Sequence, residues 1–341
     1  MSVLEFNCLP TMVGSMPHKK ASDACLLIAK YLKDIPAWPQ LTERSPQELM
    51  VPQFSNGFPG IIDKDGSLIV TKGKNWDEQL AFLYDDYLKN NYNNYTLKPE
   101  YAAAFRCFFK QKYTSLKAVK GQITGPLTWG LSVKDTDGKA IIYDELLADA
   151  TTRYLKLCVR WQEAELSKLH CNTIVSVDEP AMSAYGSAYL PLSREKIIGL
   201  MEEVFSGIKG IKSVHCCGNT DWSILMDTSV NIISFDTYNY ADSLTIYPEA
   251  VGEFLGKGNA ISWGITPNDE VNLLQETASS LKDRLEEAIS PFTRQGVDHK
   301  QILRQSLLTP SCGLARLSKD GAEETLKMLV ELSAMIRSHY L

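Results

Sequence analysis

The sequence of 341 residues lacks long apolar segments, an excess of basic residues and a leader-like start. No segment approaches the roughly 18 consecutive apolar residues of a transmembrane helix. The 35 lysines and arginines are outnumbered by 41 aspartates and glutamates, giving a formal charge of −6, so no surface suited to the phosphate backbone of nucleic acid is expected. The N-terminus has neither the basic start nor the apolar run of a signal peptide. We therefore expect a cytoplasmic protein that binds neither membrane nor nucleic acid.

The sequence also has no low-complexity linker, short repeat or heptad pattern that would divide it. Apolar residues make up 44% and charged residues 22%, which is ordinary for a globular protein. The even count of eight cysteines suggests disulfides, but a large chain of cytosolic type argues against them. Cys25, Cys107 and Cys158 lie in helix-like apolar segments and are expected to be buried as small hydrophobic residues. We expect one domain over residues 1–341.

Short apolar segments alternate with longer helical patterns along the chain. The candidate strands are residues 9–14, 37–41, 119–124, 173–177, 213–217, 232–235, 260–264 and 306–308. Helical patterns follow most of them, at residues 21–32, 144–170, 195–208, 270–289 and 320–336. This alternation predicts an α/β fold, with a parallel sheet that helices cover.

Eight candidate strands predict a closed (β/α)8 barrel, or TIM barrel. Such a barrel needs about 250 residues, so the surplus is expected in insertions. Most of the surplus lies after the second candidate strand, at about residues 42–118, where helix-like stretches at 76–92 and 99–113 would extend or cover the barrel mouth. A doubly wound open sheet is the alternative, but no Gly-rich nucleotide-binding motif follows the first candidate strand.

Unusual polar residues lie at the ends of six candidate strands. These ends read Gly14-Ser15, Thr124-Gly125-Pro126, Asp178-Glu179-Pro180, His215-Cys216-Cys217-Gly218, Asp236 and Ser311-Cys312-Gly313. The loops that follow the strands of a barrel converge at one rim, where catalytic residues gather. We therefore expect these residues to share one site.

The pattern His-x-Cys on a strand indicates a metal site. Because side chains alternate along a strand, His215 and Cys217 point the same way and Cys216 points the opposite way. Zinc prefers nitrogen and sulfur ligands, Cys312 could complete a set of three, and Asp236 is the available oxygen donor. The spacing is less specific than paired CxxC motifs. The alternative is a hydrogen-bonded structural histidine near buried cysteines.

These motifs resemble, in the same order, those of the C-terminal catalytic barrel of cobalamin-independent methionine synthase, within the uroporphyrinogen decarboxylase-like group. The chain is most similar to the short, single-barrel type. The resemblance covers nearly the whole chain. The matching segments are Val13-Gly14-Ser15, Thr124-Gly125-Pro126-Leu127-Thr128, Val177-Asp178-Glu179-Pro180-Ala181, His215-Cys216-Cys217 and Ser311-Cys312-Gly313-Leu314.

The resemblance implies that zinc binds to His215, Cys217 and Cys312 and that homocysteine is the methyl acceptor. It implies that Asp178, with Glu179 able to exchange roles with it, contacts the amino group of the substrate. The backbone of Gly14 and Ser15 would hold the substrate carboxylate. A second amino-binding carboxylate is expected within residues 43–48, at a position that the sequence does not fix.

The chain departs from the family pattern at four points. Asp236 stands where the family has a glutamate as fourth zinc ligand, and it is one methylene shorter. Ser311 replaces an aspartate. The long N-terminal half of the two-barrel enzymes, which helps to hold the folate donor, is absent, and the loop at residues 264–268 lacks the family's histidine.

The last two departures bear on the methyl donor. Methyltetrahydrofolate has a poor nitrogen leaving group that needs a proton donor, whereas a methylcorrinoid does not. We therefore expect a methylcorrinoid, methylcobalamin or a corrinoid protein, as donor, with methyltetrahydrofolate as the alternative.

Several alternatives to homocysteine methylation remain at this stage. Coenzyme M or another thiol could be the acceptor at the same zinc. Porphyrinogen decarboxylation is disfavoured because it needs no thiolate ligands. Two thiolates and one carboxylate on zinc would give a net charge of about −1, which suits alkyl transfer better than water activation. The non-enzymatic alternative is a degenerate barrel that only binds metal.

Overall fold

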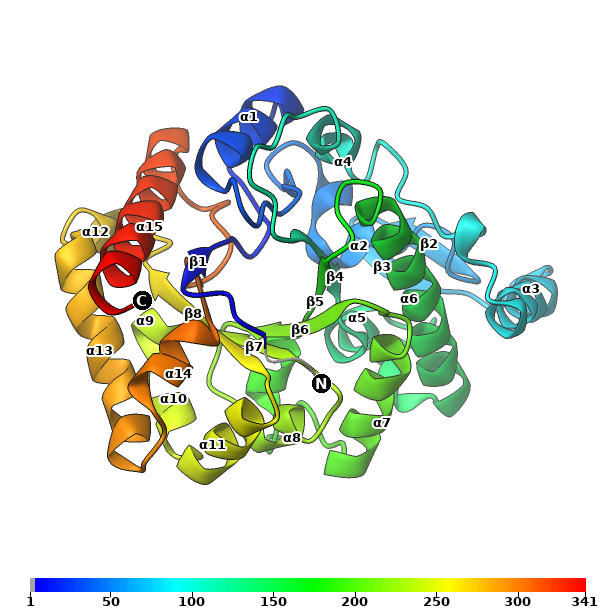
Figure 1. Ribbon diagram of the computed structural model, residues 1–341. Coiled ribbons are helices and arrows are strands. Elements are labelled where there is room, and N and C mark those ends of the chain that lie inside the picture. Colours follow the sequence, from blue (N-terminus) through cyan, green and yellow to red (C-terminus); the bar gives the residue numbers. More distant parts are fainter. Residues whose placement is uncertain (1–3) are drawn as a thin grey trace.

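A curled parallel sheet lies at the centre of the computed structural model, which describes residues 4–341 (Figure 1). In this range its strands follow the order β1-β9-β8-β7-β6-β5-β4, and every neighbouring pair is parallel. The strands are β1 (Leu9–Pro10), β4 (Val119–Thr124), β5 (Thr173–Asp178), β6 (Ile211–Cys216), β7 (Ile232–Phe235), β8 (Ala260–Thr266) and β9 (Ser306–Pro310). The predicted α/β class with a parallel sheet is confirmed.

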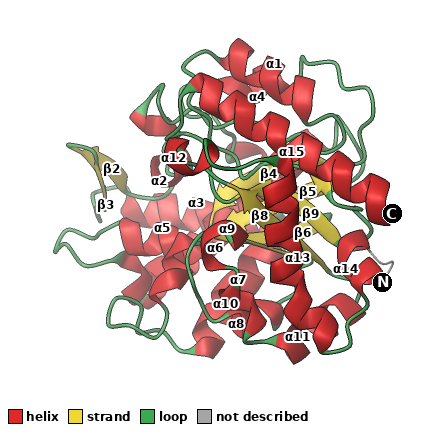
Figure 2. Cartoon of the chain, turned by 90° about the vertical axis from the view of Figure 1, so that its left-hand side faces the viewer, coloured by secondary structure: helices red, strands yellow, loops and turns green. Residues whose placement is uncertain are grey.

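Helices surround the sheet on its outer face (Figure 2). The last helix packs against β1 and α1, so elements from the beginning and the end of the sequence are in contact. The helices are α1 (Ala21–Tyr31), α5 (Pro126–Ser132), α6 (Glu145–Leu166), α7 (Arg194–Phe205), α8 (Trp222–Met226), α9 (Thr237–Tyr240), α10 (Asp242–Thr245), α11 (Pro248–Gly256), α12 (Glu270–Leu273), α13 (Ala278–Arg294), α14 (His299–Arg304) and α15 (Lys319–Tyr340). No helix in residues 4–341 is long and apolar enough to cross a membrane.

Residues 42–118 form a separate group of short elements. They are α2 (Met50–Gln53), the antiparallel hairpin of β2 (Ile61–Lys64) and β3 (Ser67–Val70), α3 (Trp76–Lys89) and α4 (Ala103–Phe108). The hairpin turns at Asp65 and Gly66, both with positive φ (53° and 82°), and Asp-Gly is a preferred pair for such two-residue turns.

Residues 36–40 close the gap between the edge strands β4 and β1. They make only the isolated parallel bridges Ala37–Lys120 and Ser15–Gln40. Backbone hydrogen bonds run from Lys120 to Pro36 and from Trp38 to Lys120 on one side. On the other side Gln40 donates to Gly14 and accepts from Met16. We call this closure the seam of the sheet.

The sequence predictions therefore need three corrections. The second predicted strand, residues 37–41, is wrong as a regular strand, because its contacts are the bridges of the seam. The predicted helix at 270–289 is two helices, since the Thr277 side chain accepts from the backbone of Ser280 and starts α13. The stretch at 99–113 is helical only over α4. The predicted domain includes residues 1–3, which lie outside the described residues.

Polar and apolar side chains together line the interior of the curled sheet. The space left there has room for roughly one water molecule. Barrel interiors are usually filled by bulky branched residues. Here the polar part of the lining is Thr11, Lys120, Ser176, Ser213, His215, Ser234, Ser262 and Thr309, and the apolar part is Met12, Val13, Ile174, Ile232 and Leu307.

Glu163 of α6 fixes the start of β6, the strand that carries His215. Its carboxylate is buried and accepts hydrogen bonds from the backbone N–H groups of Lys209 (2.9 Å) and Gly210 (2.6 Å) and from the Thr173 hydroxyl (3.0 Å). Each of these donors would lose its partner without the carboxylate.

Glu163→Ala is therefore expected to lower the free energy of unfolding by about 3 kcal/mol, measured by urea denaturation. The matched control is Glu165→Ala, which removes a surface ion pair with Lys168 from the same helix. It should change the free energy by less than about 0.5 kcal/mol. Equal effects of the two substitutions would contradict the role of Glu163.

Candidate metal centre

Three of the predicted ligands lie together at the carboxyl ends of the strands. His215 is on β6, Cys217 directly follows it, and Cys312 lies in the loop after β9. One ligand atom from each, the imidazole nitrogen and the two Sγ atoms, lies within 4.8 Å of the other two. Ligands on one tetrahedral zinc ion lie roughly 3.7 Å apart, given zinc–sulfur bonds of about 2.3 Å. The spacing of the three residues therefore fits zinc.

The imidazole of His215 has one engaged nitrogen and one free nitrogen. Nδ1 lies 3.0 Å from the Ser234 hydroxyl on the neighbouring strand β7. Nε2 is buried and makes no hydrogen bond to any residue in the described range, 4–341. Buried polar atoms nearly always have a partner, and a histidine that binds a metal typically has its other nitrogen held by a hydrogen bond. This arrangement fits a ligand to a cation.

The two thiols of the cluster lie close enough to shift each other's pKa. The nearby Cys312 and His215 lower the pKa of Cys217, and the proximity of Cys217 raises the pKa of Cys312. A cation bound between the two thiols would favour the thiolate form of both. Cys216 lies apart: it is buried, its thiol donates to the carbonyl of Gly218, and burial raises its pKa to about 12.

The structure does not bring Asp236 into the cluster of three ligand atoms. Its side chain caps α9, accepting from the backbone N–H of Asn239 (2.9 Å) and from the Asn239 amide (2.7 Å). Burial raises the pKa of Asp236 to about 6. The role of Asp236 as a fourth ligand stays a prediction.

Asp178 lies next to the cluster, because it pairs in register with His215 across β5 and β6. Its carboxylate is buried and accepts a hydrogen bond from Ser176 (2.7 Å). Burial raises the pKa of Asp178, while the nearby His215 and Lys120 oppose that rise. One oxygen of Asp178 makes no hydrogen bond within residues 4–341 and can accept one from a ligand.

Glu179 points away from Asp178, toward the N-terminus of α5. Its two oxygens accept from the backbone N–H groups of Leu127 and Thr128, both at 2.8 Å, and from the Thr128 hydroxyl at 2.6 Å. Burial raises the pKa of Glu179 to about 7 despite these donors. A side chain at Gly125 would collide with this carboxylate. Glu179 thus joins the loops after β4 and β5.

The Gly14–Ser15 turn packs against the loop that carries Cys312. Ser15 accepts a backbone hydrogen bond from Leu314 (2.9 Å), and any side chain at Gly313 would collide with the Ser15 hydroxyl. Asn268 donates to the carbonyl of Gly313 (3.3 Å) and accepts from Ser311 (3.0 Å). The predicted strand ends at residues 14–15 and 311–313 therefore contact each other, and those at 124–126 and 178–180 are joined through Glu179.

The two glutamates of residues 43–48 differ in their surroundings. Glu48 is buried and its carboxylate accepts from Leu41 (2.9 Å), Arg44 (2.7 Å) and Ala103 (3.3 Å), so it supports the fold. Glu43 is exposed and lines a surface hollow with Arg316. The second amino-binding carboxylate stays a prediction.

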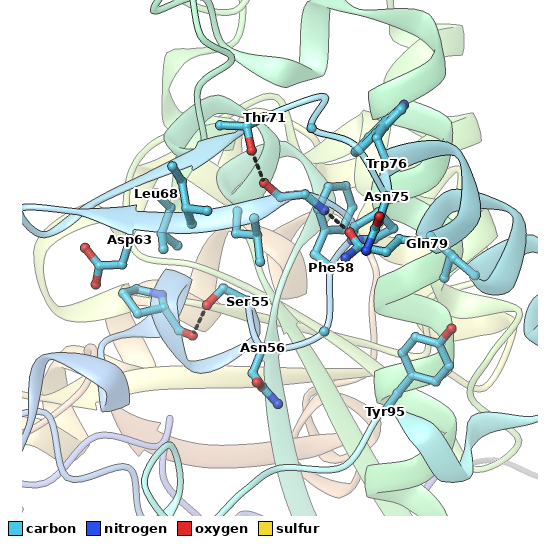
Figure 3. A pocket seen from close by; sticks show the side chains of 18 of the residues that line it. Ser55, Asn56, Phe58, Asp63, Leu68, Thr71, Asn75, Trp76, Gln79 and Tyr95 are labelled. Carbon is cyan, nitrogen blue, oxygen red and sulfur yellow. Dashed lines mark hydrogen bonds between the residues drawn. The ribbon is translucent and has the colours of Figure 1, made fainter.

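A large cleft lies apart from the cluster, within the elements of residues 42–118 (Figure 3). It has a volume of about 1230 Å³ and is lined by Phe58, Leu68, Trp76 and Tyr95 together with Asn56 and Asn75. None of the predicted site residues lines it.

Sequence reasoning missed Lys120, which is buried in the sheet interior. One signal was present: Lys120, Gln122 and Thr124 share one face of a strand that was predicted to be buried on both sides.

Comparison with known proteins gives one related sequence and several related folds. No protein-family model matches the chain. A methionine synthase of Methanocaldococcus jannaschii is 26% identical over 228 residues, which are 64% of this chain and 65% of that protein. The chain thus matches just under two thirds of the length of that relative.

Among solved structures, a B12-independent methionine synthase from a Shewanella species, in complex with selenomethionine, has a TM-score of 0.58 at 16% identity. The match covers 99% of this chain and 98% of that one. A methyltransferase from Methanosarcina mazei has a TM-score of 0.59 at 14% identity, covering 98% of this chain and 99% of that one. At these identities the structures show that the chain has the same fold as proteins named methionine synthase and methyltransferase.

Proposed function

We propose that the chain is a zinc-dependent thiol methyltransferase that converts homocysteine to methionine. The observation that carries the proposal is the cluster of His215, Cys217 and Cys312, together with the buried Nε2 atom of His215, which makes no hydrogen bond within residues 4–341. The related methionine synthase sequence supports the same reaction. The alternative acceptor, coenzyme M or another thiol, would use the same cluster.

In this proposal His215, Cys217 and Cys312 hold zinc and leave one position open, as catalytic zinc sites do. Zinc, when bound, would lower the pKa of the acceptor's thiol, so that the thiol is present as a thiolate at neutral pH. Ser234 orients the imidazole through Nδ1. Because thiolates and imidazole dominate the ligand set, the site suits a sulfur substrate better than activation of water.

The neighbouring residues would bind the amino-acid end of homocysteine. The oxygen of Asp178 that is free of protein partners can accept a hydrogen bond from the substrate ammonium group. The Gly14–Ser15 turn borders the loop of Cys312, where its backbone can face the substrate carboxylate. Glu179 supports this arrangement by holding the loops after β4 and β5 together.

The reaction itself is a substitution at the methyl carbon of the donor. The acceptor sulfur attacks that carbon, a sulfur–carbon bond forms, and the bond from the methyl carbon to the donor breaks. The electron pair of the broken bond leaves with the donor. The residues of the chain contribute by holding the sulfur and the methyl carbon in line.

Two observations bear on the donor and favour different molecules. Asn268, in the loop where the family's histidine is missing, has its amide committed to residues 311 and 313, which favours a methylcorrinoid that needs no proton donor. The name of the Shewanella enzyme, B12-independent, favours methyltetrahydrofolate instead. We retain the methylcorrinoid, free or on a corrinoid protein, as the proposed donor and methyltetrahydrofolate as the alternative.

The purified protein should contain one zinc ion per chain, measured by inductively coupled plasma mass spectrometry. Cys312→Ala should lose most of it, because two protein ligands hold zinc far less tightly than three. Cys216→Ala is the matched control, since Cys216 lies outside the cluster, and it should keep the full amount. Full zinc in Cys312→Ala would refute the ligand assignment.

Asp178→Asn should raise the KM for homocysteine by a factor on the order of 10 to 100, since a charge-assisted hydrogen bond contributes about 1.5–3 kcal/mol. The KM for 2-mercaptoethanol, which has no amino group, should stay the same. Steady-state assays with both thiols test this. A parallel loss with both acceptors would argue against contact between Asp178 and the substrate ammonium.

The donor is tested by incubating the protein with homocysteine and either methylcobalamin or methyltetrahydrofolate, and by quantifying methionine. We expect methionine from methylcobalamin and little from methyltetrahydrofolate. The opposite result would establish the folate alternative. Methylation of no thiol by either donor, despite bound zinc, would support a barrel that only binds metal.

A further inference from the structure

Lys120 is a lysine inside the curled sheet. It lies on β4, is 6% exposed, and its side chain lines the same interior as Ser176 and His215. Its ammonium group donates a hydrogen bond to the carbonyl of Val13 (2.8 Å). The space left in that interior has room for roughly one water molecule beside the lysine.

A buried ammonium group is costly, and here no ion pair compensates the cost. In residues 4–341, no carboxylate lies within the 4.0 Å of Lys120 Nζ that would define a salt bridge. Desolvation lowers the pKa of Lys120 to about 8, and the charge of Asp178 opposes that shift. An apolar residue of similar length would avoid this desolvation, so the fold alone gives no reason for a lysine.

Lys120 lies between the two parts of the proposed substrate site, which are the Gly14–Ser15 turn and Asp178. Its backbone bonds to residues 36 and 38 of the seam, and its side chain reaches past the seam to Val13. Val13 directly precedes the Gly14–Ser15 turn. On the other side, Asp178 accepts from Ser176, which lines the same interior as Lys120.

We propose that Lys120 is a positioning residue for the amino-acid end of the acceptor. Its hydrogen bond to Val13 fixes the Gly14–Ser15 turn beside the loop of Cys312, and its positive charge partly offsets the negative charge of Asp178. This inference rests on the proposed function. It adds a residue that contacts neither the substrate nor the metal. Lys120 instead positions the protein groups that bind the carboxylate and the ammonium group of the substrate.

The test is Lys120→Met, which keeps the length of the side chain and removes the charge and the donor. The variant should bind as much zinc as the wild-type protein. Its KM for homocysteine should rise about tenfold or more, the effect expected when a hydrogen bond to a charged group is lost, while the KM for 2-mercaptoethanol stays within about twofold. Calorimetric titration with methionine, the product, should show the same loss of affinity.

Thr11→Val is the matched control. It removes another interior hydrogen bond from a side chain to a backbone carbonyl, that of Thr11 to Ile35 (2.9 Å), without removing a charge. It should leave the ratio of the two KM values unchanged. An equal loss with both thiols in Lys120→Met, or loss of its zinc, would make Lys120 a general structural residue and overturn the inference.

Lys120→Gln, which keeps a donor but not the charge, is measured in the same way if Lys120→Met does not fold. Failure of both variants to fold, judged by circular dichroism, would also overturn the inference. The proposed function has a separate outcome: a wild-type protein that binds zinc but methylates neither thiol would overturn it, together with the inference that rests on it. Methylation by the wild type with no selective loss in the variants would overturn the inference alone.

Discussion

The register of three neighbouring strands is the constraint on which the site depends. Asp178 on β5 pairs with His215 on β6, and His215 pairs with Ser234 on β7. A slip of one residue would turn each side chain to the opposite face of the sheet. His215 would then point toward the helices, away from Cys312. The long apolar contacts of β4 to β9 with the surrounding helices hold this register, and they include the fully buried Trp222 and Trp263.

Lys120 and several hydroxyl side chains share the interior of the sheet with apolar residues. The lining there includes Ile174, Ile232 and Leu307, and these three belong to a small apolar cluster with Phe6 and Leu9. His215, the proposed metal ligand, and Lys120 border the same interior. Buried charges of opposite sign favour one arrangement of the groups around them, because their interaction is strong at low dielectric constant.

Much of the architecture could be predicted from the sequence. The periodic patterns gave the parallel strands and the long helices, and alternation along β6 separated Cys217 from Cys216. The joint position of His215, Cys217 and Cys312 followed from the rule that strand ends meet at one rim. The resemblance to methionine synthases supplied the expected reaction, which the residues alone did not.

Other features depend on contacts between distant residues and could not be predicted in this way. Glu179 turns toward α5 because its carboxylate accepts hydrogen bonds from two backbone N–H groups there. Asp236 accepts a hydrogen bond from Asn239 of α9, the helix that it caps. The sequence analysis did not single out Lys120, since no local pattern identifies a lysine that lies inside a curled sheet. The seam, too, is a tertiary feature: residues 37–41 have the composition of a strand, but their neighbours allow only isolated bridges.

The seam has a consequence for the motions of the molecule. Amide hydrogen exchange and local opening begin where few hydrogen bonds must break. Between β4 and β1 the wall is held by the few backbone bonds of residues 36–40, whereas β4 and β5 share a continuous ladder of six residue pairs. We therefore expect the wall to open locally on the side of Gly14 and Ser15 more readily than between β4 and β5. If the proposed function holds, an amino acid could enter and its methylated product leave by a small widening of that side, without a change in the strands that carry the proposed metal ligands.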